Sequence, residues 1–301
     1  MSDVAVYFGR ADQLLDESFE GEPDIRAVDP GHATVSVFDA GLMRGDGVFE
    51  ATTIVGGVPL AWHLHARRLR QSAAALELPL PNTGALHAFA AAAIRHSGAT
   101  EAHIKVIVTR GGADQVATVF AVVDTAYARK SPEVEIATLE RELMRDSAQR
   151  APWLLVGAKT LSYAPNMAAR REYERRGVQN AVFVTRDGFL LEGPQSSIVL
   201  REGDRVVTPH PRIGILHGTT QVEVFAWAAL NGLQTAYDDV AADRLFQADQ
   251  VWMMGGSFVQ SVTAVDGRPI AHDRARTDEI NAFLQTERDP VDAWTRDHVP
   301  G

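Results

Sequence analysis

Apolar runs and apolar residues at helical spacing alternate along the first half of the chain. Runs rich in Val and Ile, bounded by Gly or Pro, predict strands at residues 34–37, 48–55, 104–109, 116–123 and 134–139. Residues 65–78 have apolar positions at helical spacing and are closed by Pro79 and Pro81, whereas residues 83–96 are rich in alanine and end at Gly98. The pattern therefore predicts two helices within an N-terminal α/β lobe.

In the second half, short apolar runs are separated by turn residues. Residues 153–158 are predicted to form a short buried strand that ends at Lys159, and residues 162–176 a helix that stops at Gly177. Further strands are predicted at 178–185, 189–191, 196–200, 205–208, 251–254 and 259–265, and further helices at 219–230 and 278–286. The Asp-Gly, Gly-Pro and Glu-Gly-Asp turns between the earlier strands are typical of a meander or barrel.

A polar stretch at residues 144–152 interrupts both patterns and ends in a proline, which is typical of a linker. We therefore expect two lobes, residues 1–146 and residues 147–301. A chain of 301 residues, of which 46% are hydrophobic and 23% charged, is long enough to form two closely packed lobes.

Composition excludes several classes of function. The net charge of −10 disfavours nucleic acid or an anionic membrane as the main partner, because the average field would repel either. The absence of cysteine excludes disulfides, thiolate metal sites and cysteine nucleophiles. The first ten residues lack a signal-peptide pattern, and no apolar run reaches the ~18–20 residues that span a bilayer. We expect a cytoplasmic protein with no membrane partner.

Lysine is rare in this chain. Of the 29 lysines and arginines only Lys105, Lys130 and Lys159 are lysine. Arginine cannot replace lysine where chemistry needs a primary amine that loses its proton and attacks a carbonyl. Burial at the end of an apolar segment would favour the neutral amine of Lys159. A lysine that extends its ammonium group into solvent from a strand end is the structural alternative.

Five segments, in this order, resemble the motif series of fold-type IV pyridoxal-phosphate enzymes, the family of branched-chain aminotransferases, D-amino-acid aminotransferases and aminodeoxychorismate lyases. They are Asp39-Ala40-Gly41-Leu42-Met43-Arg44-Gly45-Asp46-Gly47-Val48-Phe49-Glu50, His65-Ala66-Arg67-Arg68-Leu69, Lys159-Thr160-Leu161-Ser162-Tyr163, Leu191-Glu192-Gly193 and Gly214-Ile215-Leu216-His217-Gly218-Thr219-Thr220. The resemblance covers nearly the whole chain. It implies an α/β (α+β) fold with a smaller N-terminal lobe and a larger C-terminal pseudo-barrel lobe, pyridoxal 5'-phosphate as cofactor, and a homodimer.

The resemblance also implies roles for single residues. Lys159 would hold the cofactor as a Schiff base and act in catalysis, Glu192 would face the pyridine nitrogen, and Arg68 would clamp the phosphate. Tyr163 would bind the phenolate oxygen. The remaining cofactor contacts would be Ser196, Leu216, Gly218, Thr219, Thr220, Gly256 and Ser257.

Several of these residues also have ordinary structural explanations. Gly218-Thr219-Thr220 opens a predicted helix, whose free N–H groups suit a phosphate but equally suit a simple helix cap. Arg68 could be a solvated helix residue, Glu192 a turn residue and Tyr163 a core residue. Where the family has Ser-Asn, this chain has Ser196-Ser197, so we carry over Ser196 as a cofactor contact but not the hydrogen bond of the asparagine side chain.

The reaction depends on the substrate pocket. Residues 103–112 resemble the Lys-Val-Val-Ile-Ser-Arg-Gly pattern of aminodeoxychorismate lyases, so Lys105 and Arg110 could bind the two carboxylates of aminodeoxychorismate. D-amino-acid transaminases have Tyr where Phe49 stands and an Arg-x-His trap that Ala113-Asp114-Gln115 does not offer.

Branched-chain enzymes have Tyr-x-Arg where this chain has His103 and Lys105. We therefore expect a lyase that forms 4-aminobenzoate and pyruvate in the folate pathway, with Phe49, Lys105 and Arg110 at the substrate. The alternatives are an amino-acid aminotransferase, branched-chain or D-specific, and a non-catalytic binding protein that keeps the fold.

Overall fold

The computed structural model describes residues 3–112, 117–127 and 131–285. It divides into two compact units. The first unit comprises Met1–Arg129 together with Ala158–Tyr163, and the second comprises Lys130–Gly157 and Ala164–Gly301. This division differs from the predicted boundary at residue 146. The strand that begins at Glu133 pairs within the second unit, and residues 158–163 return to pair within the first.

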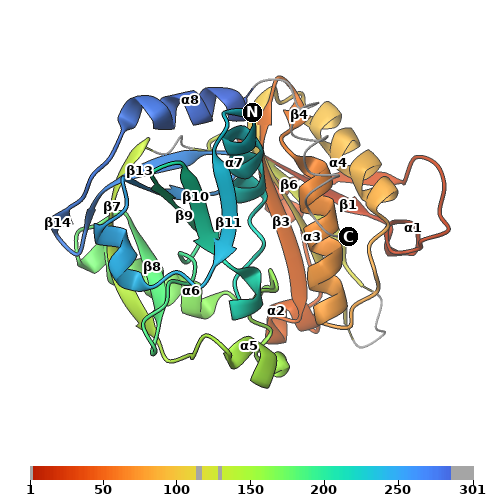
Figure 1. Ribbon diagram of the computed structural model, residues 1–301. Helices are drawn as coiled ribbons and strands as arrows, with labels where there is room; N and C mark the ends of the chain where they lie inside the picture. The colour runs from red at the N-terminus through yellow and green to blue at the C-terminus, as the bar shows by residue number, and fades with distance from the viewer. Residues whose placement is uncertain (1–2, 113–116, 128–130, 286–301) are drawn as a thin grey trace. The chain divides into compact units, whose positions relative to one another are not determined.

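The first unit is built on a six-stranded antiparallel sheet. Its order is β2 (Ile25–Val28), β1 (Val4–Gly9), β6 (Val119–Asp124), β5 (Glu101–Thr109), β3 (Gly47–Val55) and β4 (Val58–Pro59). Helices α3 (Trp62–Ala75) and α4 (Thr83–Ser97) lie side by side on one face of the sheet (Figure 1). Short helices α1 (Ala11–Leu14) and α2 (Ala40–Arg44) connect the N-terminal strands.

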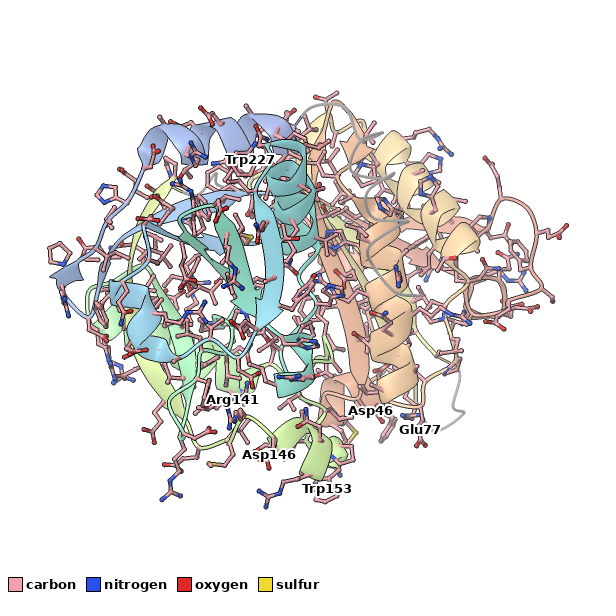
Figure 2. The ribbon with its side chains drawn as sticks, in the orientation of Figure 1. Asp46, Glu77, Arg141, Asp146, Trp153 and Trp227 are labelled. Atoms are coloured by element: carbon pink, nitrogen blue, oxygen red, sulfur yellow. The ribbon has the colours of Figure 1, made fainter. Side chains whose placement is uncertain are left out.

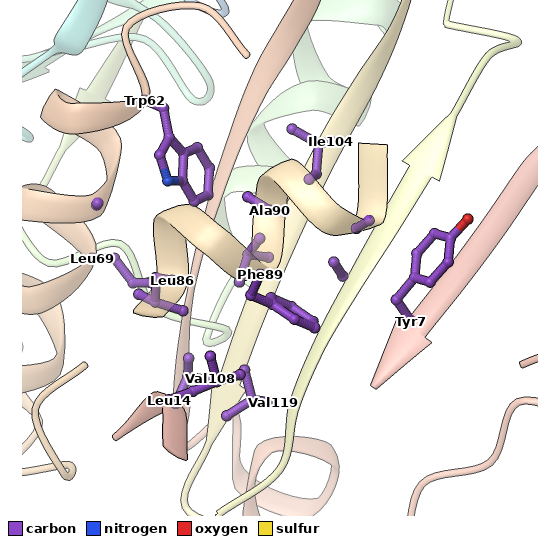
Figure 3. Packing of buried hydrophobic residues seen from close by; sticks show 14 of the residues in the cluster. Tyr7, Leu14, Trp62, Leu69, Leu86, Phe89, Ala90, Ile104, Val108 and Val119 are labelled. Atoms are coloured by element: carbon purple, nitrogen blue, oxygen red, sulfur yellow. The ribbon is translucent and has the colours of Figure 1, made fainter. Parts of the chain in front are cut away.

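The apolar core of the first unit lies between the sheet and helices α3 and α4. Phe89 of α4 is fully buried and lies among Leu86, Val108 and Val119 (Figure 3). Alternate residues of β3 point to opposite faces of the sheet, so Val48, Glu50, Thr52 and Ile54 face the helices, and all four are buried. A carboxylate, Glu50, is therefore enclosed on the helix side of the sheet.

The second unit contains a mixed eight-stranded sheet. Its order is β11 (Gln234–Asp238), β10 (Arg205–Pro209), β9 (Ser197–Glu202), β12 (Gln250–Met254), β13 (Val259–Val265), β7 (Glu133–Arg141) and β8 (Asn180–Thr185), with β14 (Arg268–Pro269) paired to β13. Its helices are α5 (Ser147–Arg150), α6 (Ala164–Arg175), α7 (Thr219–Leu230) and α8 (Arg274–Leu284). Helices α7 and α8 contact each other (Figure 1). Phe225, Trp252 and Ile280 share one buried cluster.

The predicted helices α3, α4, α6, α7 and α8 and most of the predicted strands are confirmed, and α7 and β13 have the predicted bounds. The predicted strand at 34–37 is wrong. Those residues form no strand, and Val37 and the neighbouring Phe38 are 69% and 66% exposed. An apolar run indicates a surface that avoids water, but it does not show whether that surface packs within the chain.

The predicted buried strand at 153–158 is also wrong. Pro152 begins a 3-10 turn, and Leu155 (φ 51°) and Gly157 (φ 90°) have left-handed backbone that ends any extended run. Trp153 is 75% exposed and projects from the second unit (Figure 2).

In the part of the chain that is described, no helix combines the length and the apolar character that crossing a membrane would need.

The central position of Phe89 generates a prediction about stability. We expect Phe89→Ala to lower the free energy of unfolding by ~3–5 kcal/mol, because it leaves a cavity in a closed core. Leu230→Ala, at a position 58% exposed at the end of α7, is the control and should change it by no more than about 0.5 kcal/mol. Urea unfolding of both variants checks this, and equal losses would contradict the described core.

Candidate active site

The predicted site residues fall into two groups, one in each unit, and each group has its own geometry. The first unit holds Phe49, Arg68, Lys105, Arg110, Lys159 and Tyr163. The second unit holds Glu192, Ser196, Leu216, Gly218, Thr219, Thr220, Gly256 and Ser257.

Lys159 lies in a short segment that pairs with the beginning of β3. The Phe49 backbone N–H donates to the Lys159 carbonyl at 3.1 Å, and the Leu161 N–H donates to the Gly47 carbonyl at 2.8 Å. The Lys159 N–H donates to Ser72 Oγ on α3 at 3.0 Å. These bonds fix the backbone of Lys159 beside Phe49. The strand that the sequence predicted immediately before Lys159 is absent.

The Phe49 ring is the centre of this group. Lys105 Nζ lies 4.5 Å and Lys159 Nζ 4.6 Å from the ring centre, and Tyr163 meets the ring edge-on at 5.5 Å. Lys105 reaches the ring because it pairs with Ala51, and Ala51 and Phe49 share one face of β3. Burial lowers the pKa of Lys105. Two amines thus lie against one apolar ring, which favours cations through its π face.

Tyr163 reaches Phe49 by a route that differs from the predicted one. The predicted helix at 162–176 included it, but α6 begins only at Ala164, and the chain bends at Leu161. The turn places both side chains against the same ring without a helix.

On the opposite face of β3, the buried carboxylate of Glu50 binds two side chains of α3. Arg68 Nε donates to Glu50 Oε1 at 2.6 Å and Arg68 Nη2 to Oε2 at 2.8 Å, and His65 Nδ1 lies 2.6 Å from Oε2. His65 and Arg68 are three residues apart, so they share one face of the helix. Both therefore reach the same carboxylate, which holds the Arg68 guanidinium in one orientation.

The charges in this cluster shift its pKa values. Burial alone would raise the pKa of Glu50, but Arg68 and His65 outweigh it and hold that pKa well below the usual range. Burial lowers the pKa of His65, Glu50 opposes this, and the charges of Arg68 and Lys159 lower it further. Glu50 therefore stays ionised and His65 stays neutral near pH 7.

Arg110 makes hydrogen bonds that hold the fold together. Its Nε donates to Asp46 Oδ2 at 2.6 Å, and its two terminal nitrogens donate to the carbonyls of Leu76 (2.6 Å) and Glu77 (3.2 Å). Asp46 and Glu77 lie at the same end of the first unit (Figure 2). The role of Arg110 in binding a substrate remains a prediction, and of Lys105 and Arg110 it is Lys105 that contacts the Phe49 ring.

In the second unit, Gly218-Thr219-Thr220 forms the N-terminus of α7, as predicted. Gly218 is the N-cap and supplies no side chain, so the first backbone N–H groups of α7 have no side-chain cap. A Cβ on Gly218 would lie 2.2 Å from Ser197 Oγ, so a larger residue there would require Ser197 to shift. Ser257 N–H donates to Thr220 Oγ1 at 3.0 Å, which joins the predicted Gly256-Ser257 loop to the start of the helix.

Glu192 and Ser196 lie in the turn between β8 and β9. The Leu216 N–H donates to Glu192 Oε1 at 3.2 Å, which orients the carboxylate. Gly193 N–H donates to the Ser196 carbonyl at 2.7 Å, and Asn180 Nδ2 donates to Ser196 Oγ at 3.1 Å. Ser197 occupies the asparagine position of the family pattern and contacts Gly218 instead.

Sequence reasoning did not identify Glu50 as a partner of Arg68. The signal was present, because Glu50 occupies a helix-facing position of a buried strand and faces a His-x-x-Arg helix. A buried carboxylate requires cations, and the i, i+3 pair supplies them. Residues 113–116, which include the stretch compared with the Arg-x-His trap, lie outside the described residues.

The chain is similar to known proteins over most of its length. The sequence model of amino-transferase class IV matches residues 47–265. A relative from Mycobacterium tuberculosis, named "Bifunctional aminodeoxychorismate lyase / D-amino acid transaminase", is 33% identical over 261 residues, which cover 81% of this chain and 90% of the relative.

Two solved structures resemble the whole chain. The fold IV-transaminase CpuTA1 from Curtobacterium pusillum has 34% identity and a TM-score of 0.88, with 94% of this chain and 98% of that chain covered. The PLP-bound form of a hypothetical aminotransferase from Mycobacterium tuberculosis has 31% identity and a TM-score of 0.81, with 86% and 94% covered. These matches confirm the predicted fold class.

The lowered pKa of His65 predicts a pH dependence of stability. Because its pKa in the folded chain lies below the unfolded value of ~6.5, the unfolded chain binds more protons as the pH falls below that value, and stability is lost. We expect the stability difference between wild type and His65→Gln to shrink between pH 7.5 and pH 5.5, by up to ~1.4 kcal/mol per pH unit. Urea unfolding at each pH measures it, and a constant difference would contradict a neutral buried His65.

Proposed function

The chain belongs to the class IV aminotransferase family, and within that family we propose that it is a 4-amino-4-deoxychorismate lyase that forms 4-aminobenzoate and pyruvate. It is a fold-type IV enzyme, its cofactor is pyridoxal 5'-phosphate, and its substrates are small amino or oxo acids. The observation that carries the lyase proposal is the second amine, Lys105, at the ring that Lys159 also contacts.

The donors and acceptors of the described residues suit this cofactor. Lys159 offers a primary amine for the Schiff base, and the N-terminus of α7 offers N–H groups and a positive dipole end for the phosphate. Glu192 offers an oriented carboxylate for the pyridine nitrogen. We assign the other contacts to Arg68, Tyr163, Ser196, Leu216, Gly218, Thr219, Thr220, Gly256 and Ser257.

Each assigned side chain has a chemical task. When bound, the cofactor supplies an electron sink for the carbon that loses a proton. Lys159 Nζ takes that proton as a neutral amine, and the Glu192 carboxylate keeps the pyridine nitrogen protonated. Glu50 fixes the Arg68 guanidinium that we assign to the phosphate. The C–O bond between the ring and the enolpyruvyl group then breaks, which makes the ring aromatic, and the proton held by Lys159 converts the released enolpyruvate to pyruvate.

Lys105 accounts for substrate choice in this proposal. Aminodeoxychorismate carries two carboxylates, and an ammonium group near the reacting amine binds one of them by a charge-assisted hydrogen bond. Phe49 provides an apolar surface, only 8% exposed, against which a ring-shaped substrate can pack.

An aminotransferase acting on D-amino acids is the second candidate. The relative from Mycobacterium tuberculosis carries both activities in its name, so the same residues are compatible with either reaction. The two reactions diverge after the first proton transfer, according to whether a leaving group departs or the proton returns at a different position.

We also infer a cytoplasmic homodimer that serves folate synthesis. Val37, Phe38, Leu42 and Met43 in the first unit are each more than half exposed. Exposed apolar side chains so close together in the sequence are typical of a surface that a partner covers, and closed twofold dimers are the commonest form of homo-oligomer.

Substitution of Lys105 tests the lyase proposal. We expect Lys105→Met to lower kcat/KM for aminodeoxychorismate by about 10- to 150-fold, because a charge-assisted hydrogen bond of ~1.5–3 kcal/mol is lost. For Arg110→Met we expect the main effect to be a lower free energy of unfolding rather than a lower kcat/KM, because its hydrogen bonds go to Asp46 and to two backbone carbonyls. Turnover is measured beside a panel of L- and D-amino acids with 2-oxo acids. If both variants stay within about twofold of wild type at equal cofactor occupancy, transamination becomes the better proposal.

A further inference from the structure

Two of the three lysines of this chain converge on one aromatic ring. Lys105 Nζ and Lys159 Nζ lie 4.5 and 4.6 Å from the centre of the Phe49 ring. The two nitrogens are therefore separated by no more than about twice that distance. They belong to the same unit, and both are anchored to β3: Lys105 by strand pairing with Ala51, and Lys159 by the backbone bond to Phe49.

Lys105 and Glu50, which lie on opposite faces of β3, differ in the charged groups around them. Among the described residues, no carboxylate forms an ion pair with Lys105. The neighbouring anion on the other face of β3 is Glu50, which is already matched by Arg68 and His65.

Tyr163 is a further titratable side chain at this ring, which it meets edge-on at 5.5 Å. Partial burial already disfavours a charge on Lys105, and a second charge nearby adds to that cost.

We propose that Lys105 is a positioning residue that acts through its charge on Lys159. By disfavouring a second ammonium group at Phe49, it keeps Lys159 in the neutral form that can attack a carbonyl. This inference rests on the proposed function in one respect, namely that Lys159 is the amine that binds the cofactor.

The same arrangement couples Lys159 to the substrate. A carboxylate that pairs with Lys105 cancels its charge, so Lys159 Nζ then holds a proton more strongly. Lys159 is therefore neutral when it must attack, and a stronger proton acceptor once an anionic substrate is bound. Binding of an anionic substrate thereby favours the next step, in which Lys159 Nζ takes a proton from the substrate.

The small number of lysines permits a direct test in the full-length chain. Lysine labelled with 13C at Cε gives one signal for each of three residues, and Lys→Met variants assign them. The titration midpoint of each amine is then measured by NMR with the cofactor removed. In the holoenzyme, the pH dependence of the visible absorbance of the bound cofactor provides a second readout.

We expect Lys105→Met to move the Lys159 midpoint to higher pH by about one unit or more, as a unit charge within about 9 Å does at an effective dielectric constant near 20. Lys159→Met should move the Lys105 midpoint in the same direction, since the coupling is mutual. Lys105→Arg keeps the charge and should stay within about 0.3 pH units of wild type. Arg26→Met removes another cation over a phenylalanine ring of the same unit and should leave the Lys159 midpoint unchanged.

The proposal is overturned if Lys105→Met leaves the Lys159 midpoint within about 0.3 pH units of wild type. It is equally overturned if Lys105→Arg shifts the midpoint as far as Lys105→Met, because packing and not charge would then be the cause. Lys105 is only partly buried and Met matches its length, so the variant should fold, and Lys105→Gln provides a second neutral side chain. These outcomes need neither substrate nor turnover, so the coupling can fail or hold independently of the lyase proposal.

Discussion

The backbone hydrogen bonds between the residues around Lys159 and the first residues of β3 determine where the reactive amine lies. The chain has left the first unit and formed β7 of the second before residues 158–163 return to make this pairing. Consecutive residues of β3 then act on opposite faces. The Phe49 ring contacts the two lysines, and the Glu50 carboxylate binds His65 and Arg68 of α3. One strand thereby supports both the amine and the guanidinium that we assign to the cofactor.

In the second unit, the proposed cofactor contacts are held by hydrogen bonds and close contacts that involve the backbone, whereas in the first unit they are held by contacts between side chains. Gly218 brings its backbone close to Ser197, Thr220 accepts the Ser257 N–H, and Glu192 accepts the Leu216 N–H. Such groups are fixed before any ligand binds, so little reorganisation is needed when an anion arrives at the start of α7. The Lys105 and Lys159 amines, by contrast, respond to charge, and that response is what links the substrate to the chemistry in the proposal above.

Much of this could be predicted from the sequence, because helices and strands with strong periodicity pack in the way their patterns indicate. Helix α7 and strand β13 have the predicted bounds, and the lysine count drew attention to Lys159 and Lys105, which lie against the same ring. The failures share one cause. An apolar run such as 34–37 or 153–158 does not reveal whether it packs inside, and only backbone angles such as the left-handed Leu155 decide against a strand.

The partners of charged residues were harder to predict than their presence. Arg68 was identified but its carboxylate, Glu50, was not, because that pairing depends on which face of β3 meets α3. Arg110 was grouped with Lys105 on sequence grounds, yet its hydrogen bonds go to Asp46 and to backbone carbonyls. Strand register and helix packing decide these contacts, and neither is visible from spacing alone.

The central claim is that Lys159, and not Lys105, binds the cofactor. The chain has only three lysines, so reduction of the holoenzyme with borohydride followed by peptide mass spectrometry identifies the lysine that carries the cofactor. We predict that the reduced adduct lies on the peptide that contains Lys159 and is absent from Lys159→Ala. An adduct on Lys105 in the wild type, or a chain-linked adduct that survives in Lys159→Ala, would contradict the account.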